Sequence, residues 1–241
     1  MRFIVLALAL VLTAANTEPT IRSLVQQKNY EQAFELAQTN AAKDDRRAHF
    51  WLGWFYERGQ GTETDVTKAA QHYRAASDLG LGAGSWHVGY MIDKGIIEGE
   101  PEEAFAFFQK AADQGFVNGY VSMAVMQATG RGTPLNYEAA LMNYMGAAQL
   151  GSAHAAQGVG VMLNTGQGVD KNKPEAAAWF LFSAARGNQT GATNFRLTLS
   201  EIENPDQPAI VKRAEAIADE MGFPVNITIV DGEVQWSKPA E

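Results

Sequence analysis

The side chains best suited to acid–base or metal chemistry are four histidines: His49, His72, His87 and His154. No two of them show a metal-ligand spacing such as i, i+4, with a carboxylate between them, which would place two ligands on one helix face. The chain contains no cysteine, which excludes disulfides, thiolate nucleophiles and cysteine-based metal sites. We therefore predict no catalytic residues, no cofactor and no metal site.

Three other patterns suggest ligands, but their context argues against each. Glycine pairs such as Gly59 and Gly61 could cradle a phosphate, yet they follow helical patterns and precede no Lys-Ser/Thr pair. A Ser-x-x-Lys motif, which would suggest a penicillin-binding serine enzyme, does not occur. The segment 170–175 faintly resembles a calcium loop but lacks the further acidic ligands and the central glycine, so we interpret it as a solvated loop.

Composition narrows the class of protein and of partner. Of the 241 residues, 46% are apolar and 19% are charged, so the chain can bury a substantial core. The net charge is -8 and no basic run occurs. Nucleic acids and anionic membranes attract clustered lysines and arginines, so neither is a predicted partner.

The first residues are typical of a secretory signal peptide. Arg2 precedes an apolar run of ten residues, Phe3 to Leu12, and small residues follow as far as Ala15. A transmembrane anchor is the alternative, but spanning a bilayer takes about 20 apolar residues. We expect residues 1–15 to be removed, leaving a periplasmic or secreted protein without a stable membrane anchor.

The remainder of the chain repeats itself with a period near 36 residues. The closing glycines of four segments, 46–80, 81–115, 116–151 and 152–187, are 35, 36 and 36 residues apart. Three of the recurring columns are Leu52, Val88, Met123 and Val159; Ala69, Ala104, Ala140 and Ala176; and Tyr73, Phe108, Tyr144 and Phe180. Within a repeat, these residues recur every three or four positions, which predicts two helices with one apolar face each.

Local signals mark the ends of these helices. Asp65, Asn136 and Asn172 stand where the second helices need an N-cap, and Pro101 and Pro174 fall in first turns. Four glycines stand where a left-handed residue should end the first helix: Gly59, Gly95, Gly130 and Gly166. Each repeat is therefore predicted to be a helical hairpin.

One such hairpin cannot cover its own apolar face, so the repeats must stack and their ends need caps. Residues 16–45 are predicted to form an N-terminal capping hairpin and residues 188–222 the C-terminal capping helices. In the tail, 223–241, Asp231 and Gly232 separate two alternating apolar stretches, which predicts a short β-hairpin. The hairpin could dock on the helices or on a partner.

The repeat pattern resembles that of the Sel-1-like family, relatives of the tetratricopeptide repeats. Its residues here are Ala48, Leu52, Gly53, Tyr56, Gly59, Gly61, Lys68, Ala69, Ala70, Tyr73, Ala76, Leu79 and Gly80. The second repeat departs from the pattern, because Ile97 replaces the second loop glycine. The resemblance implies an all-α, right-handed α/α superhelix, a solenoid that acts as an adaptor or regulator in protein assembly without catalysis.

In tetratricopeptide-like hairpins, the first helix lines a concave groove. The positions two before and two after the Leu52 column should face this groove, and in the first two repeats they hold Phe50, Trp54, Trp86 and Tyr90. The later repeats hold the smaller residues Val121, Val125, Gln157 and Val161. Because aromatic residues often anchor interfaces, the four rings form a candidate partner-binding patch. Alternatively, they pack between adjacent helices.

The leading functional prediction is an exported, non-enzymatic scaffold that binds a protein or peptide through its concave groove. One alternative is a hydrolase directed at cell wall or β-lactams on the same repeats, although no nucleophile with a base in reach can be assembled from the sequence. Another is a chaperone or inhibitor of a secreted enzyme, whose C-terminal hairpin adds a strand to its partner's sheet. Partner identity and oligomeric state stay open.

Overall fold

A computed structural model describes residues 19–237, so the predicted signal peptide, 1–15, lies outside the described part. The described residues form the predicted all-α superhelix with a short β-hairpin at its C-terminal end. Its elements are α1 (Ile21–Gln26), α2 (Tyr30–Ala41), α3 (Arg46–Arg58), α4 (Val66–Asp78), α5 (Gly82–Asp93), α6 (Pro101–Asp113), α7 (Val117–Thr129), α8 (Tyr137–Gln149), α9 (Ala153–Thr165), α10 (Lys173–Ala185), α11 (Gln189–Ser200), α12 (Gln207–Met221), β1 (Asn226–Val230) and β2 (Glu233–Ser237). None of these helices is long and apolar enough to cross a membrane.

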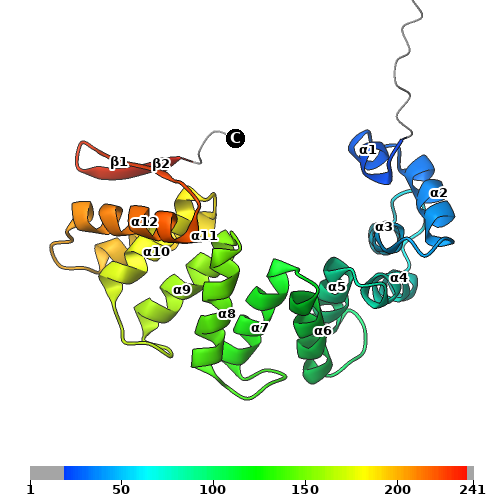
Figure 1. The fold of residues 1–241 in the computed structure, drawn as a ribbon, viewed down its shortest axis with the longest axis horizontal. Coiled ribbons are helices and arrows are strands. Elements are labelled where there is room, and N and C mark those ends of the chain that lie inside the picture. The colour runs from blue at the N-terminus through cyan, green and yellow to red at the C-terminus, as the bar shows by residue number, and fades with distance from the viewer. Residues whose placement is uncertain (1–18, 238–241) are drawn as a thin grey trace, which may run out of the picture.

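The helical pairs follow one another along an arc (Figure 1). Helices α1 and α2 form one tip of the arc, and α12 with the β-hairpin forms the other. In the first two repeats, α3 and α5 lie on the inner side of the arc and α4 and α6 on the outer side. First helices of neighbouring repeats also meet, since α5 packs against α7 and α9 against α11. In these two repeats, the concave face is therefore built from first helices.

Side-chain caps start the second helices where the sequence predicts them. Asp65, Asn136 and Asn172 each accept a hydrogen bond from the backbone N–H three residues on, at 2.9, 2.9 and 3.0 Å. Each bond satisfies one of the backbone donors that a helix start leaves unpaired. Pro101 and Pro174 occupy first turns, as predicted. The four predicted helix-end glycines all have positive φ, between 63° and 80°.

The two helices of a repeat approach closely because an aromatic ring lies on a glycine. Methyl groups built at Gly53, Gly89 and Gly160 would lie 2.7, 2.9 and 2.6 Å from the rings of the recurring aromatic column. Those rings belong to Tyr73, Phe108 and Phe180, which are at most 3% exposed. In the third repeat, Ala124 takes the glycine position, and Tyr144 lies against Gly158 of the next repeat instead.

The C-terminal end carries the most fully covered helix. All ten residues from Ala176 to Ala185 on α10 are buried, because α9, α11 and α12 pack around it. The β-hairpin turns at Asp231 and Gly232, which both have positive φ, as the Asp-Gly pair predicts. Ile227 is 8% exposed, and the ring of Trp236 meets that of Phe195 edge-on at 5.6 Å. The hairpin thus docks on the helices.

Candidate partner-binding groove

The four aromatic residues predicted to face the groove lie on the two inner helices at the N-terminal end of the arc. Phe50 and Trp54 belong to α3, and Trp86 and Tyr90 belong to α5. All four are half-buried. Their surroundings differ from one ring to the next.

Phe50 fills space between helices. Its ring lies 5.5 Å from the ring of Tyr73 on α4 and 5.3 Å from that of His87 on α5. The ring therefore contributes to the junction of the first two repeats. For this residue, the geometry agrees with the packing alternative, and little of the ring is left for a partner.

The other three rings are likewise half-buried, in different surroundings. Trp54 lies at the edge of the N-terminal cluster, 6.3 Å from Tyr30 and 5.6 Å from Trp51. Trp86 and Tyr90 stack on each other with centroids 5.2 Å apart and planes 18° apart. The indole Nε1 of Trp86 donates to Ser122 Oγ at 3.0 Å, which ties α5 to the next first helix, α7. Trp86 and Tyr90 thus present a fixed aromatic platform.

Two residues that were not among the predicted ones connect these rings. Trp51 lies 6.1 Å from Phe50, and His87 lies 5.1 Å from Trp86. Together they make one continuous chain of rings from α3 to α5. Both occupy the position just before the Leu52 column, which the concave-face rule does not assign to the groove.

An apolar side chain stands two positions after the Leu52 column in all five first helices. We call these residues the apolar row: Trp54, Tyr90, Val125, Val161 and Leu197. Val125 is 39% exposed and Leu197 is 58% exposed, although both are large apolar residues. Leu197 was not among the predicted groove residues, although it stands at the equivalent position of the helix that follows the fourth repeat. The row takes one residue from each of α3, α5, α7, α9 and α11.

The most buried histidine of this region is held uncharged. His87 stacks on Tyr73 at 4.5 Å, and its Nδ1 has no hydrogen-bond partner among the described residues. Burial lowers the pKa of His87; nearby Glu57 opposes this shift and Arg58 adds to it. The Tyr73 hydroxyl donates to Glu57 at 2.7 Å, and burial followed by this bond raises the pKa of Tyr73. Both rings are neutral packing groups near pH 7.

The fold also brings together two histidines that are 23 residues apart. His49 on α3 and His72 on α4 place their Nδ1 atoms 3.1 Å from each other, which is a hydrogen-bond distance. Burial, and next the neighbouring His49, lowers the pKa of His72. One imidazole must donate and the other accept. Within residues 19–237, no group of three or more His, Asp or Glu side chains could hold a metal ion.

We expect the free energy of unfolding to fall as the pH drops below about 6.5, the ordinary histidine pKa. His72 and His87 have lowered pKa values in the folded chain, so the unfolded chain takes up protons first. The loss of unfolding free energy is complete only when the pH has fallen below the pKa values of the two histidines in the folded chain. Urea unfolding at pH 7.5 and 5.5 measures it, in a range where carboxylates titrate little. In a His72→Phe/His87→Phe variant, the free energy of unfolding should differ much less between the two pH values. A difference as large as that of the wild type would contradict this explanation.

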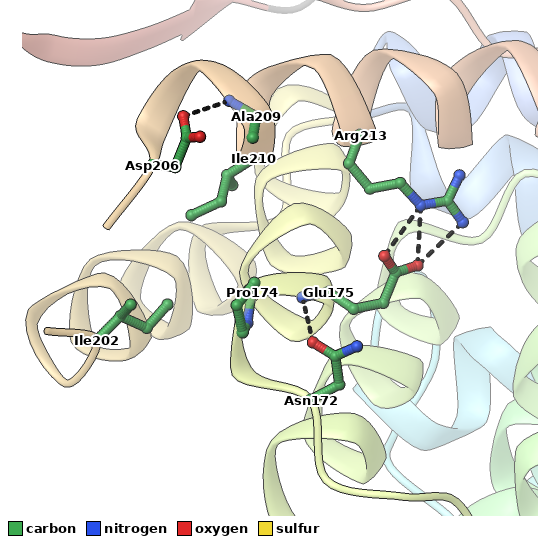
Figure 2. A pocket seen from close by; sticks show the side chains of 8 residues that line it. All are labelled: Asn172, Pro174, Glu175, Ile202, Asp206, Ala209, Ile210 and Arg213. Atoms are coloured by element: carbon green, nitrogen blue, oxygen red, sulfur yellow. Dashed lines mark hydrogen bonds and ion pairs between the residues drawn. The ribbon is translucent and has the colours of Figure 1, made fainter. Parts of the chain in front are cut away.

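A pocket of about 230 Å³ lies between α10 and α12 (Figure 2). Its polar groups already have partners. Arg213 Nε donates to both oxygens of Glu175, at 3.0 and 2.9 Å, while Asn172 and Asp206 cap the starts of α10 and α12. The pocket is also smaller than ordinary ligand sites, which measure roughly 300–1,000 Å³. We interpret it as the joint that fixes α12 on α10.

Comparison with known proteins agrees with this geometry. The model of the Sel1 repeat matches residues 24–45, 46–81, 83–116, 118–152 and 153–188. The chain belongs to the Sel1 repeat family. The first match falls in the segment predicted as the N-terminal capping hairpin. Proteins with Sel1 repeats generally act as non-catalytic scaffolds that mediate protein–protein interaction.

Individual relatives are similar over most of this Sel1 repeat chain. A Sel1 repeat protein from Oxalobacter formigenes is 27% identical, with a TM-score of 0.68 over 86% of this chain and 85% of that one. A protective antigen of uropathogenic Escherichia coli is 19% identical, with a TM-score of 0.70 over 84% of this chain and 45% of that one, and shares the fold. An uncharacterized protein of Neisseria meningitidis serogroup B is 26% identical over 184 residues, which are 76% of this chain but only 38% of that protein.

Proposed function

We propose that this protein is an exported scaffold that binds a protein or peptide partner in its concave groove and catalyses no reaction itself. The observation that carries the proposal is the apolar row. Packing within the repeats does not require its two most exposed members, since Leu197 is 58% exposed and Val125 is 39% exposed. Apolar area that stays in water in the free protein is available to stabilise a complex, by roughly 25 cal/mol for each Å² covered.

The groove suits a long, narrow partner. A partner segment that lies along the row meets one apolar contact per repeat, with aromatic anchors at Trp54 and Tyr90. Burial of such rings at the centre of an interface commonly supplies most of the binding energy.

Export is part of the proposal and rests on the sequence alone. Arg2, the apolar run from Phe3 to Leu12 and the small residues up to Ala15 are typical of a cleaved signal peptide. The intact mass of the protein recovered outside the cytoplasm should match a chain that begins at Asn16. Recovery of the full-length chain in the cytoplasm would refute this part.

The histidines give no support to the alternative of a hydrolase. Catalysis of that type needs a nucleophile beside a base that can accept a proton. His72 shares a hydrogen bond with His49, and His87 is stacked on Tyr73 within a packed cluster. Since burial lowers the pKa of both His72 and His87, their environment favours the uncharged ring that packing requires.

The test is capture of the partner from the exported fraction of the native cells. A Val125→Asp/Leu197→Asp variant places two charges in the apolar row and should lose the captured protein, because a charged carboxylate is costly to bury at an interface. The control, Leu135→Asp/Met142→Asp, makes the same change at residues that are 56% and 69% exposed on and before α8. Both variants should melt close to wild type. If both variants capture the same amount of the partner, binding in the groove is refuted.

A further inference from the structure

The aromatic end of the apolar row carries two cations at equivalent positions. The guanidinium of Arg58 lies over the ring of Trp54 at 5.2 Å, and the ammonium of Lys94 lies over the ring of Tyr90 at 5.9 Å. Each cation follows its row residue by four positions, which is one helix turn. The next two repeats have Thr129 and Thr165 there, and these hydroxyls donate to carbonyls of their own helices.

These cations are poorly neutralised within the protein. Among residues 19–237, Arg58 makes no ion pair, and its side chain is exposed. Lys94 lies 3.4 Å from Asp93, but Asp93 also pairs with Arg131 at 2.6 Å and is only 8% exposed. Glu57, which precedes Arg58 in the chain, accepts a hydrogen bond from Tyr73. The two carboxylates are thus engaged, while Arg58 and Lys94 retain free donors.

The two cations belong to a molecule that is negatively charged overall. The chain as a whole has a net charge of -8, so a highly acidic partner would be repelled from most of its surface. Arg58 and Lys94 would attract an acidic segment to the aromatic end of the groove. Stacking on Trp54 also holds the Arg58 guanidinium in place, which leaves its edge free for a carboxylate and reduces the entropy lost on binding.

We propose that the N-terminal half of the groove recognises an acidic and apolar segment of the partner. This inference rests on the proposed function and names the chemistry of its ligand. Apolar side chains of the segment lie on Trp86 and Tyr90, and its Asp or Glu carboxylates bind Arg58 and Lys94.

The test uses a phage-displayed library of random 12-residue peptides against the exported chain. Wild-type protein should enrich peptides that place Asp or Glu next to large apolar residues. An Arg58→Glu/Lys94→Glu variant should instead enrich Lys and Arg at those positions. The matched control is Lys43→Glu/Lys212→Glu, which makes the same change in net charge at two exposed lysines outside the groove and should select like wild type.

A synthetic copy of the peptide that wild type enriches most then measures how much the two cations contribute to affinity. Its affinity, measured by fluorescence anisotropy, should fall roughly tenfold or more in the charge-reversed variant, because two charge-assisted hydrogen bonds are lost and like charges face each other instead. Enrichment of neutral or basic peptides, no enrichment, or the same selection by both variants would overturn the inference. If the selected peptides still require Trp86 but ignore the two cations, groove binding survives; if they ignore Trp86 as well, the proposed function fails too.

Discussion

Replacing Gly160 with alanine is expected to destabilise the protein by about 2 kcal/mol, although alanine is the better helix former. The new methyl would lie 2.6 Å from two ring carbons of Phe180. Phe180 is 1% exposed and has no space into which to move. Overpacking of this kind costs about 1–3 kcal/mol, which exceeds the gain of about 1 kcal/mol in helix propensity.

The same contact can be tested from its other side. Phe180→Ala alone should cost about 4 kcal/mol, because it leaves a cavity in the most buried helix. In that background Gly160→Ala should no longer clash, and its effect should reverse to a stabilisation of up to about 1 kcal/mol. Urea unfolding of the wild type, the two single variants and the double variant measures this coupling.

Gly146 on α8 provides the control for these substitutions. A methyl at Gly146 would meet no atom within 4 Å, so Gly146→Ala should stabilise the protein by up to about 1 kcal/mol. Equal effects at Gly146 and Gly160 would show that ring-on-glycine contact does not hold the helical pairs together.

The second large effect is expected at Trp86. Trp86→Ala should weaken partner binding by about 2 kcal/mol or more, which is roughly 30-fold, because it removes half of the aromatic platform in the groove. Trp86→Phe retains an aromatic ring and should lose less affinity for the partner. Isothermal titration calorimetry with the captured partner measures both.

Trp86 also contributes to folding, which the controls must separate. Its Nε1 bonds to Ser122 at 3.0 Å, so Ser122→Ala removes that bond and leaves the ring. Ser122→Ala should keep most of the affinity. If Trp86→Ala instead lowers the melting temperature sharply and leaves the affinity intact, the ring serves packing, as the ring of Phe50 does.

The repeat architecture could be predicted because its signals are local. Asn136 and Asn172 cap helices through bonds that reach only three residues, and the Asp231–Gly232 pair fixes its own turn. The docking of the hairpin was left open, since it depends on Trp236 meeting Phe195, a contact between distant parts of the chain. No local pattern determines such a contact.

The candidate site was predicted only in part, for a similar reason. Spacing rules within one helix cannot find His49 beside His72, because these residues belong to different helices. The rules also placed Phe50 in the groove, whereas its ring meets Tyr73 and His87. How far each ring is covered depends on the angle between successive repeats. Leu197, by contrast, was within reach of the column analysis.

Site-specific photocrosslinking tests the binding groove most directly. A benzoylphenylalanine replaces Tyr90 on α5 in one protein and Met142, which is 69% exposed on α8, in another. After irradiation of cells that produce each protein, we expect a single prominent adduct from position 90 and none of that mass from position 142. An adduct from position 142 alone, or the same adduct from both positions, would contradict a partner seated in the concave groove.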